Sequence, residues 1–139
     1  MVRYIPEKLR RLVSERAGGL CEYCLIPETV VLAAHEIDHI IPKKHGGLTE
    51  SENLALSCAL CNKHKGTDLA SLDPFTGEIV ALYHPRRDRW SDHFQLSNNQ
   101  FIPLTPTGRV TIQLLQLNQQ SRTEERKLLI EAGMFNLSG

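Results

Sequence analysis

Apolar positions near the start of the chain follow the period of a helix. One face of residues 6–17 gathers the apolar side chains and one arginine, with charged residues elsewhere: Leu9, Leu12, Val13 and Arg16. This spacing is typical of an amphipathic helix. Gly18 and Gly19 follow as a stop signal, so the pattern predicts a short N-terminal helix.

The next apolar run has a different character. Residues 29–41 are rich in β-branched side chains and end at Pro42, which indicates a strand or the first arm of a hairpin. Gly46 and Gly47 then mark a turn or loop. Residues 52–56 are too few to separate a helical turn from a return strand, and residues 61–65 predict a helical turn closed by Gly66.

The second half of the chain predicts a turn, a strand, a hairpin and two helices. The turn spans residues 73–77, the strand 78–83, and the hairpin joins 94–96 to 101–104. Thr105 before Pro106 resembles an N-cap followed by proline at the first helical position, which opens a helix to about residue 118. Ser121 with Glu124 resembles a capping box, which opens a last helix that ends near residue 133.

Composition narrows the class of protein without naming a function. The chain has 139 residues, 41% of them hydrophobic, and a formal net charge of zero. We expect one domain, with a core at about residues 18–68 and a C-terminal extension at 69–139 that packs on it. The first residues lack a signal-peptide pattern, and no apolar run has the length of a membrane span, so we expect a cytoplasmic protein.

All four cysteines fall into two Cys-x-x-Cys pairs, Cys21 with Cys24 and Cys58 with Cys61. Each short pair can wrap one side of an ion, and four sulfur ligands suit tetrahedral Zn²⁺ with no open position. The pattern therefore predicts a structural zinc site rather than a catalytic one. Two redox pairs, or four unrelated buried thiols, are the alternatives.

The residues between and beside the cysteine pairs carry the chemistry of phosphodiester hydrolysis. His39 is a candidate general base, since neutral imidazole accepts a proton near pH 7. The neighbouring Asp38 and the amide oxygen of Asn62 are hard ligands, which favour Mg²⁺ or Mn²⁺ at a second, catalytic metal site. Glu36 shares the strand face of Asp38 and is either a neighbour of that metal or a solvated edge carboxylate.

The strings DHIIP, KKHGG, ENLALSC and CNKHKG carry a family resemblance over about residues 20–66. They resemble the HNH endonuclease motif in its zinc-ribbon-supported form. The resemblance implies a ββα-metal (His-Me finger) core, which together with the N-terminal helix, the C-terminal β-hairpin and the two helices predicted above makes an α+β fold. It also implies hydrolysis of DNA. The segment from His84 to Phe135 is similar to a tail on some small bacterial HNH proteins.

The resemblance assigns roles to four positions. His39 corresponds to the general base, Asp38 to a metal ligand, and Asn53 to the asparagine that braces the loop orienting the base. The third motif position is Asn62, which makes the chain an HNN variant and shifts the expected catalytic metal toward magnesium. His64 points to another helix face than Asn62, so we do not expect it to bind the metal.

Local clusters of basic residues are candidates for DNA phosphate contacts despite the neutral total. The candidates flank the motif or lie in the stretch HPRRDRW: Lys43, Lys44, Lys63, Lys65, Arg86, Arg87 and Arg89. The alternative for HPRRDRW is a helix whose arginines pair with Asp88 and Asp92 while Trp90 packs in the core.

The function that these observations favour is a metal-dependent DNA endonuclease with one catalytic cation. The alternative is a catalytically inactive, zinc-stabilised module that only binds nucleic acid. Binding alone, however, needs none of Asp38, His39 and Asn62. A protein-interaction zinc module of the RING kind would call for two interleaved zinc sites, which four cysteines do not readily supply. A protein partner or a homodimer stays open at this point.

Overall fold

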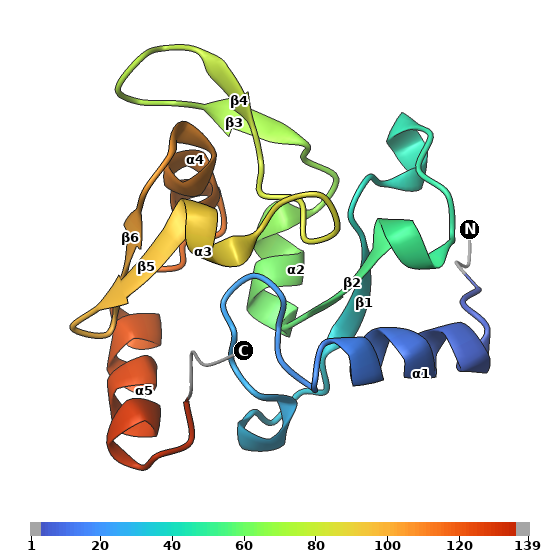
Figure 1. Cartoon of the computed structure of the whole chain (residues 1–139), viewed down its shortest axis with the longest axis horizontal. Helices are drawn as coiled ribbons and strands as arrows, with labels where there is room; N and C mark the ends of the chain where they lie inside the picture. Colours follow the sequence, from blue (N-terminus) through green and yellow to red (C-terminus); the bar gives the residue numbers. More distant parts are fainter. Residues whose placement is uncertain (1–3, 136–139) are drawn as a thin grey trace.

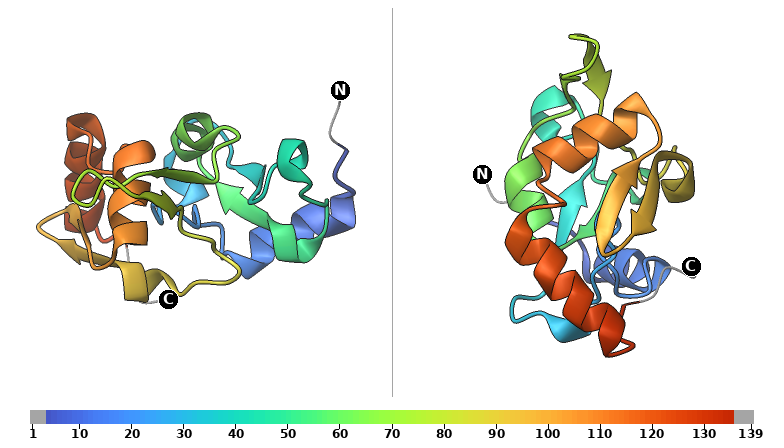
Figure 2. Two further views of the ribbon diagram at one scale, coloured as in Figure 1. Left: turned by 90° about the horizontal axis from the view of Figure 1, so that it is seen from above. Right: turned by 90° about the vertical axis from the view of Figure 1, so that its left-hand side faces the viewer.

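The computed structural model describes residues 4–135 and places the two halves of the chain side by side. The first half contributes α1 (Glu7–Arg16), β1 (Glu36–His39), β2 (Leu54–Ser57) and α2 (Ala59–Lys65). The second contributes β3 (Ala70–Leu72), β4 (Ile79–Ala81), α3 (Trp90–His93), β5 (Phe94–Ser97), β6 (Gln100–Pro103), α4 (Pro106–Leu114) and α5 (Gln120–Glu131). Helices α1 and α5 lie toward opposite ends of the molecule (Figures 1 and 2). The predicted α+β architecture is confirmed.

Helix α1 covers the hairpin of β1 and β2 with its apolar stripe. Val13 is fully buried and packs in a small cluster with Ile5, Leu54 and Leu56. The helix ends at Arg16, and Gly18 adopts a positive φ of 63° that most residues avoid. The predicted N-terminal helix and its glycine stop are therefore confirmed, although Leu12 is 46% exposed.

Strands β1 and β2 pair antiparallel, with Asp38 opposite Ala55 and His39 opposite Leu54. The predicted strand at residues 29–41 is too long, because only Glu36–His39 is extended and paired. Residues Glu28–Val30 form a 3₁₀ turn, and the Glu28 carboxylate accepts a hydrogen bond from the His35 backbone N–H at 2.8 Å. This local bond bends the segment away from a sheet despite its β-branched residues.

The return segment combines both alternatives that the sequence left open. Ser51–Asn53 is a 3₁₀ turn, and Leu54–Ser57 is the return strand. Helix α2 starts directly after β2, with Cys58 as its N-cap and Gly66 as its C-cap. The result is a β-β-α unit in which α2 continues directly from the hairpin of β1 and β2, as the predicted ββα core requires (Figure 1).

The second half contains two hairpins and two main helices. The hairpin of β5 and β6 turns at Asn98 and Asn99, which both have positive φ, as predicted. Strand β4 was predicted, but its partner β3 was not, because three residues carry too little periodicity. Thr105 caps α4 by accepting a bond from the Gly108 N–H at 3.0 Å, which confirms the predicted start of that helix.

Two predicted helix boundaries are wrong. Helix α4 ends at Leu114 rather than near residue 118, because Gln116 adopts a left-handed backbone with φ 53°. The proposed capping box at Ser121 does not form, since α5 already starts at Gln120 and its N-cap is Gln119. The Gln119 carbonyl accepts the N–H of Arg122 at 2.9 Å, which places Ser121 inside the first turn.

The main core joins the two halves around the cysteines. It consists of buried side chains from both halves: Cys21, Tyr23, Cys24, Ile26, Cys58, Cys61, Tyr83, Phe94, Phe101, Leu115, Leu117 and Phe135. Trp90 packs against Phe94 and Phe101, and its indole N–H donates to the Tyr23 carbonyl at 3.0 Å. Within residues 4–135, no helix is long and apolar enough to cross a membrane.

An ion pair between a half-buried arginine and a buried aspartate links two elements of the second half. Arg109 of α4 donates two hydrogen bonds of 2.8 Å to the Asp73 carboxylate at the β3–β4 turn. These bonds lower the pKa of Asp73 to about 2, so the carboxylate stays ionised in mild acid. The pair holds the hairpin of β3 and β4 against α4, where the two elements contact each other.

Candidate functional site

The structure brings three predicted site residues to one hollow at the end of β1. Asp38, His39 and Asn62 line this hollow together with Pro42, Gly66 and Thr67. Asp38 and His39 come from the strand, and Asn62 comes from the first turns of α2. Because β1 pairs with β2 and α2 follows β2 directly, the hairpin geometry sets where the amide of Asn62 lies relative to the strand.

The carboxylate of Asp38 is buried and held from two sides. The Tyr23 hydroxyl donates to Oδ2 at 2.8 Å, and the Lys65 ammonium lies 3.2 Å from the same oxygen. Burial raises the pKa of Tyr23 well above its usual value, and the charge of Asp38 raises it further, so the phenol remains a donor. Both contacts hold the carboxylate in one orientation at the end of β1.

Lys65 therefore departs from its predicted place at the DNA surface. Its side chain is almost fully buried, and its ammonium also donates to the backbone carbonyls of His39 and Ile40 at 3.2 and 3.0 Å. A buried ammonium is stable only when it is paired and hydrogen bonded. The lysine is thus a structural brace that ties α2 to the end of β1.

The imidazole of His39 is oriented by a hydroxyl that the sequence pattern did not indicate. Nε2 lies 2.8 Å from Oγ1 of Thr49, in the loop between β1 and β2. When Nε2 carries the proton and donates to this oxygen, Nδ1 is the nitrogen that holds the lone pair. Thr49 could not be identified from the sequence, because the partner of a ring nitrogen depends on how the loop folds back.

Asn53 braces the loop that carries Thr49. Its side-chain oxygen accepts the Ile41 N–H at 2.9 Å, and its amide nitrogen donates to the carbonyls of Ile41 and Leu48, both at 2.9 Å. A Cβ built on Gly47 would lie 1.6 Å from the Ile41 carbonyl oxygen, so only glycine fits there. The loop is thereby held tightly against the end of β1.

Asn62 pairs with the carboxylate of Glu36, which also belongs to β1. Its amide nitrogen donates to Oε1 of Glu36 at 2.6 Å. Since this bond uses Nδ2 as the donor, Oδ1 is the atom that can accept from or coordinate another group. The site offers a carboxylate, an amide oxygen and an imidazole, a set of donors that fits Mg²⁺ or Mn²⁺ with water completing the coordination.

A second hollow opens beside His39 on the side of α1. It is lined by His39, Glu36, His35 and Arg10 of α1. Arg10 is exposed, and its Nε donates to the Ile5 carbonyl at 3.1 Å. This arginine could not be singled out from the sequence, because a helical pattern does not say which end of a strand the helix will lie beside.

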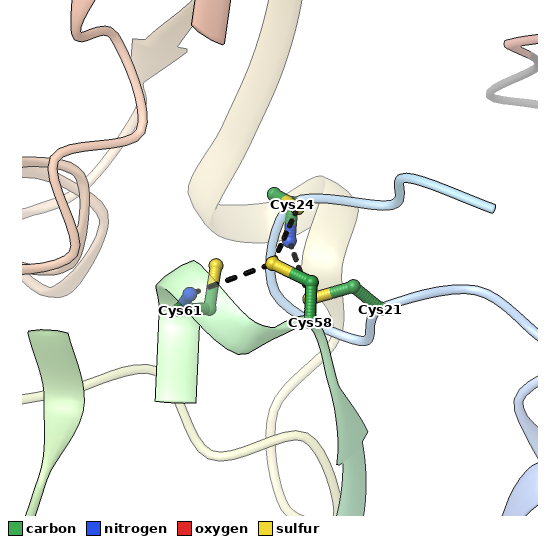
Figure 3. Close-up of side chains that lie close together, drawn as sticks. All are labelled: Cys21, Cys24, Cys58 and Cys61. Atoms are coloured by element: carbon green, nitrogen blue, oxygen red, sulfur yellow. Dashed lines mark hydrogen bonds between the residues drawn. The ribbon is translucent and has the colours of Figure 1, made fainter. Parts of the chain in front are cut away.

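The four cysteines form one cluster at the junction of the two halves (Figure 3). All four sulfur atoms lie within 4.8 Å of one another, and Cys24 Sγ is 3.7 Å from Cys58 Sγ. Four sulfurs at the usual Zn–S length of ~2.3 Å around a tetrahedral ion lie about 3.8 Å apart, so the spacing fits zinc. Among residues 4–135, this is the one cluster of three or more His, Cys, Asp or Glu side chains placed to hold a metal.

The electrostatics of the cluster are consistent with a bound cation. Burial raises the pKa of the Cys21 thiol, whereas hydrogen bonds from the neighbouring thiols lower the pKa of Cys58. Four buried sulfurs at this spacing cannot all be ionised unless a positive ion compensates their charge. The cluster is therefore compatible with structural zinc, as the sequence predicted.

The predicted basic residues divide into exposed and buried ones. Exposed side chains belong to the turn after Pro42, to α2 and to the HPRRDRW stretch: Lys43, Lys44, Lys63, Arg87 and Arg89. Arg86 instead pairs with Glu22 in the loop of the first cysteine pair, and both side chains are largely buried. Trp90 packs in the core as the alternative interpretation expected, but the carboxylate of Asp88 accepts the His84 backbone N–H at 2.9 Å.

Comparison with known proteins agrees with this geometry. Residues 21–68 match the family model of the HNH endonuclease. The chain is also 28% identical, over 118 residues, to the Septu protein PtuB of Bacillus thuringiensis. The aligned part covers 84% of the chain but only 43% of that relative's length. The matched segment begins at Cys21 and contains both cysteine pairs and the hollow at the end of β1.

Proposed function

We propose that residues 21–68, which match the family model of the HNH endonuclease, make the chain a metal-dependent endonuclease that hydrolyses DNA phosphodiester bonds. One observation carries the proposal: Asp38, His39 and Asn62 line the same hollow. Nucleic-acid binding alone would need none of the three in one place. HNH nucleases act on DNA as a family, and this hollow is where the reaction would occur.

In this proposal His39 takes the proton from the attacking water. Thr49 accepts from Nε2 and thereby holds the tautomer whose Nδ1 can act as the base. Asn53 and Gly47 keep the loop in place, so the imidazole does not swing away from the hollow. A base that is fixed before the substrate binds loses less freedom in the reaction.

Asp38 and Asn62 would hold the catalytic Mg²⁺ or Mn²⁺ through their oxygens. When bound, such a cation polarises the phosphate and stabilises the departing 3′ oxygen. Tyr23 and Lys65 hold the Asp38 carboxylate in place. Because Lys65 also offsets one negative charge, the protein alone should bind the cation weakly, and the phosphate of the substrate would complete the site.

Exposed basic residues around the hollow would position the DNA backbone. Lys43 and Lys44 follow Pro42, which lines the hollow, and Lys63 follows Asn62. Arg10 lies on the opposite side, in the hollow that shares His39. Arg87 and Arg89 extend the surface into the second half of the chain. Lys65 and Arg86 are left out, since both are buried in ion pairs.

A plasmid-nicking assay tests the proposed activity. Purified protein of measured zinc content is mixed with supercoiled DNA in Mg²⁺, in Mn²⁺ and in neither. We expect nicked and linear products only with the added cation. Folded, zinc-containing protein that binds DNA but produces no nicks with either cation would contradict the proposal and favour a binding module without catalysis.

Replacing Thr49 with valine tests how the base is oriented. The change keeps the shape but removes the acceptor of Nε2, so we expect kcat to fall roughly tenfold or more with KM nearly unchanged. The acidic limb of the pH–rate profile should move, because the protonated imidazole would lose the hydroxyl oxygen that accepts from its Nε2–H. Thr49→Ser retains the hydroxyl and should restore both readouts, whereas equal losses in both variants would indicate a purely structural residue.

A further inference from the structure

Helix α5 buries two arginines that lie one helical turn apart. The side chains of Arg122 and Arg126 belong to residues that are 6% and 4% exposed. A buried guanidinium is costly unless its charge and its N–H groups find partners. The two arginines have different partners, so each can serve as a control for the other.

Arg122 is directed at the sulfur cluster. Its Nη2 donates to Cys61 Sγ at 3.2 Å and lies 3.9 Å from Cys58 Sγ, while Nη1 donates to the Leu115 carbonyl at 2.8 Å. The guanidinium therefore places a positive charge and an N–H donor directly beside two of the four sulfurs. Of the two arginines, Arg122 is therefore the one that contacts the sulfur cluster.

Arg126 is buried without contacting any of the sulfurs through a hydrogen bond. It donates to the carbonyls of Asn99 and Leu117 at 2.7 and 2.8 Å. Its guanidinium also stacks over the ring of Phe101, 4.1 Å from the centroid. Burial is the largest influence on its pKa, which it lowers. This arginine braces the turns around α5 and makes no hydrogen bond to the cluster, although the charges of Cys24 and Cys61 act on it at longer range.

Charge explains why the cluster gains from Arg122. Zn²⁺ with four thiolates carries a formal charge of about 2−, which is unfavourable in a buried site unless nearby donors offset it. Cys21, Cys24, Cys58 and Cys61 all lie in the HNH domain, whereas Arg122 lies in the C-terminal extension. The guanidinium thus supplies half of the missing positive charge from outside the domain that binds the ion.

We propose that Arg122 is a positioning residue of the zinc site, so that zinc affinity depends on α5 of the C-terminal extension being docked. The reverse also follows, because linkage is reciprocal: without the metal-bound thiolates, Arg122 would be a buried cation with too little negative charge beside it. The inference rests on zinc binding at the four cysteines but not on DNA cleavage.

Zinc competition against a chromophoric chelator tests the proposal with a matched pair of variants. Arg122→Met removes the donor and the charge from the cluster, and we expect zinc affinity to fall about 10–100-fold. Arg126→Met removes an equally buried arginine from the same helix that makes no hydrogen bond to a sulfur, so it should lower the melting temperature but weaken zinc binding much less than Arg122→Met. Arg122→Lys retains the charge and should lose less affinity than Arg122→Met.

Cobalt spectra give a readout that depends neither on activity nor on overall stability. In the Co²⁺-loaded protein, the sulfur-to-cobalt charge-transfer band should move to longer wavelength in Arg122→Met, because the sulfur loses a hydrogen bond. It should stay in place in Arg126→Met. Parental affinity and spectrum in Arg122→Met, or equal weakening of zinc binding in both methionine variants, would overturn the proposal. A parent that binds no zinc would overturn it too, whatever the nicking assay shows.

Discussion

His39→Ala is expected to lower the rate of DNA nicking by roughly 10²–10⁴-fold, the usual contribution of a general base. The imidazole lies in the hollow with Asp38 and Asn62, where Thr49 orients its ring. Alanine leaves the metal ligands in place but removes the group that takes the proton. DNA binding should therefore persist while the chemical step slows.

The measurement is single-turnover nicking of supercoiled plasmid at saturating Mg²⁺ or Mn²⁺. Because His39 is buried, zinc content and thermal unfolding are measured alongside, and His39→Gln provides a variant with a better-filled site. His64→Ala is the matched control, since this histidine lies on α2 but does not line the hollow. Parental nicking by folded His39→Ala would remove the histidine from the mechanism.

The contrast between His39 and Thr49 shows what the sequence could and could not predict about the site. His39 and Asp38 are adjacent in an ordered motif, and both cysteine pairs have ligand spacing, so each signal is local. The contacts of Thr49, Arg10 and Lys65 depend on how a loop, a helix and a buried stem pack against the end of β1. The spacing of apolar residues carries no information about such packing. For this reason the sequence predicts Lys65 at the surface, whereas the structure buries it.

The same distinction separates the correct and incorrect parts of the predicted fold. Thr105 and Pro106 cap α4 through neighbouring residues, and that boundary was predicted correctly. The β-branched run before Pro42 has strand propensity, but Glu28 and His35 bond locally and leave only Glu36–His39 to pair. The strand propensity of this run is overridden by a hydrogen bond between Glu28 and His35, which are seven residues apart. The link from Arg122 to the cysteines spans a still greater sequence distance.

Replacing Cys58 with serine should have the largest effect on stability. Structural zinc sites contribute binding free energies of roughly 10–16 kcal/mol in zinc-finger peptides, which is comparable with the entire stability of a small domain. Cys58 supplies one of the four sulfurs and also caps α2, where its Sγ accepts the Cys61 N–H at 3.4 Å. Losing this ligand should release zinc. The variant should then be unfolded at 25 °C, show no cooperative thermal transition, and no longer nick DNA.

Calorimetry and metal analysis distinguish this expectation from the other interpretations of the cysteines. Cys21→Ser should behave like Cys58→Ser, because each sulfur is one ligand of the same ion. A phosphine reductant that leaves zinc in place should not change the melting temperature of the parent, whereas a strong chelator should lower it by tens of degrees, ~20 °C or more. Unfolding caused by the reductant would instead indicate disulfides. A parental melting temperature in Cys58→Ser would mean that the four thiols are merely buried. The hollow at the end of β1 depends on the first outcome, since α2 carries Asn62 directly after Cys61 of the sulfur cluster.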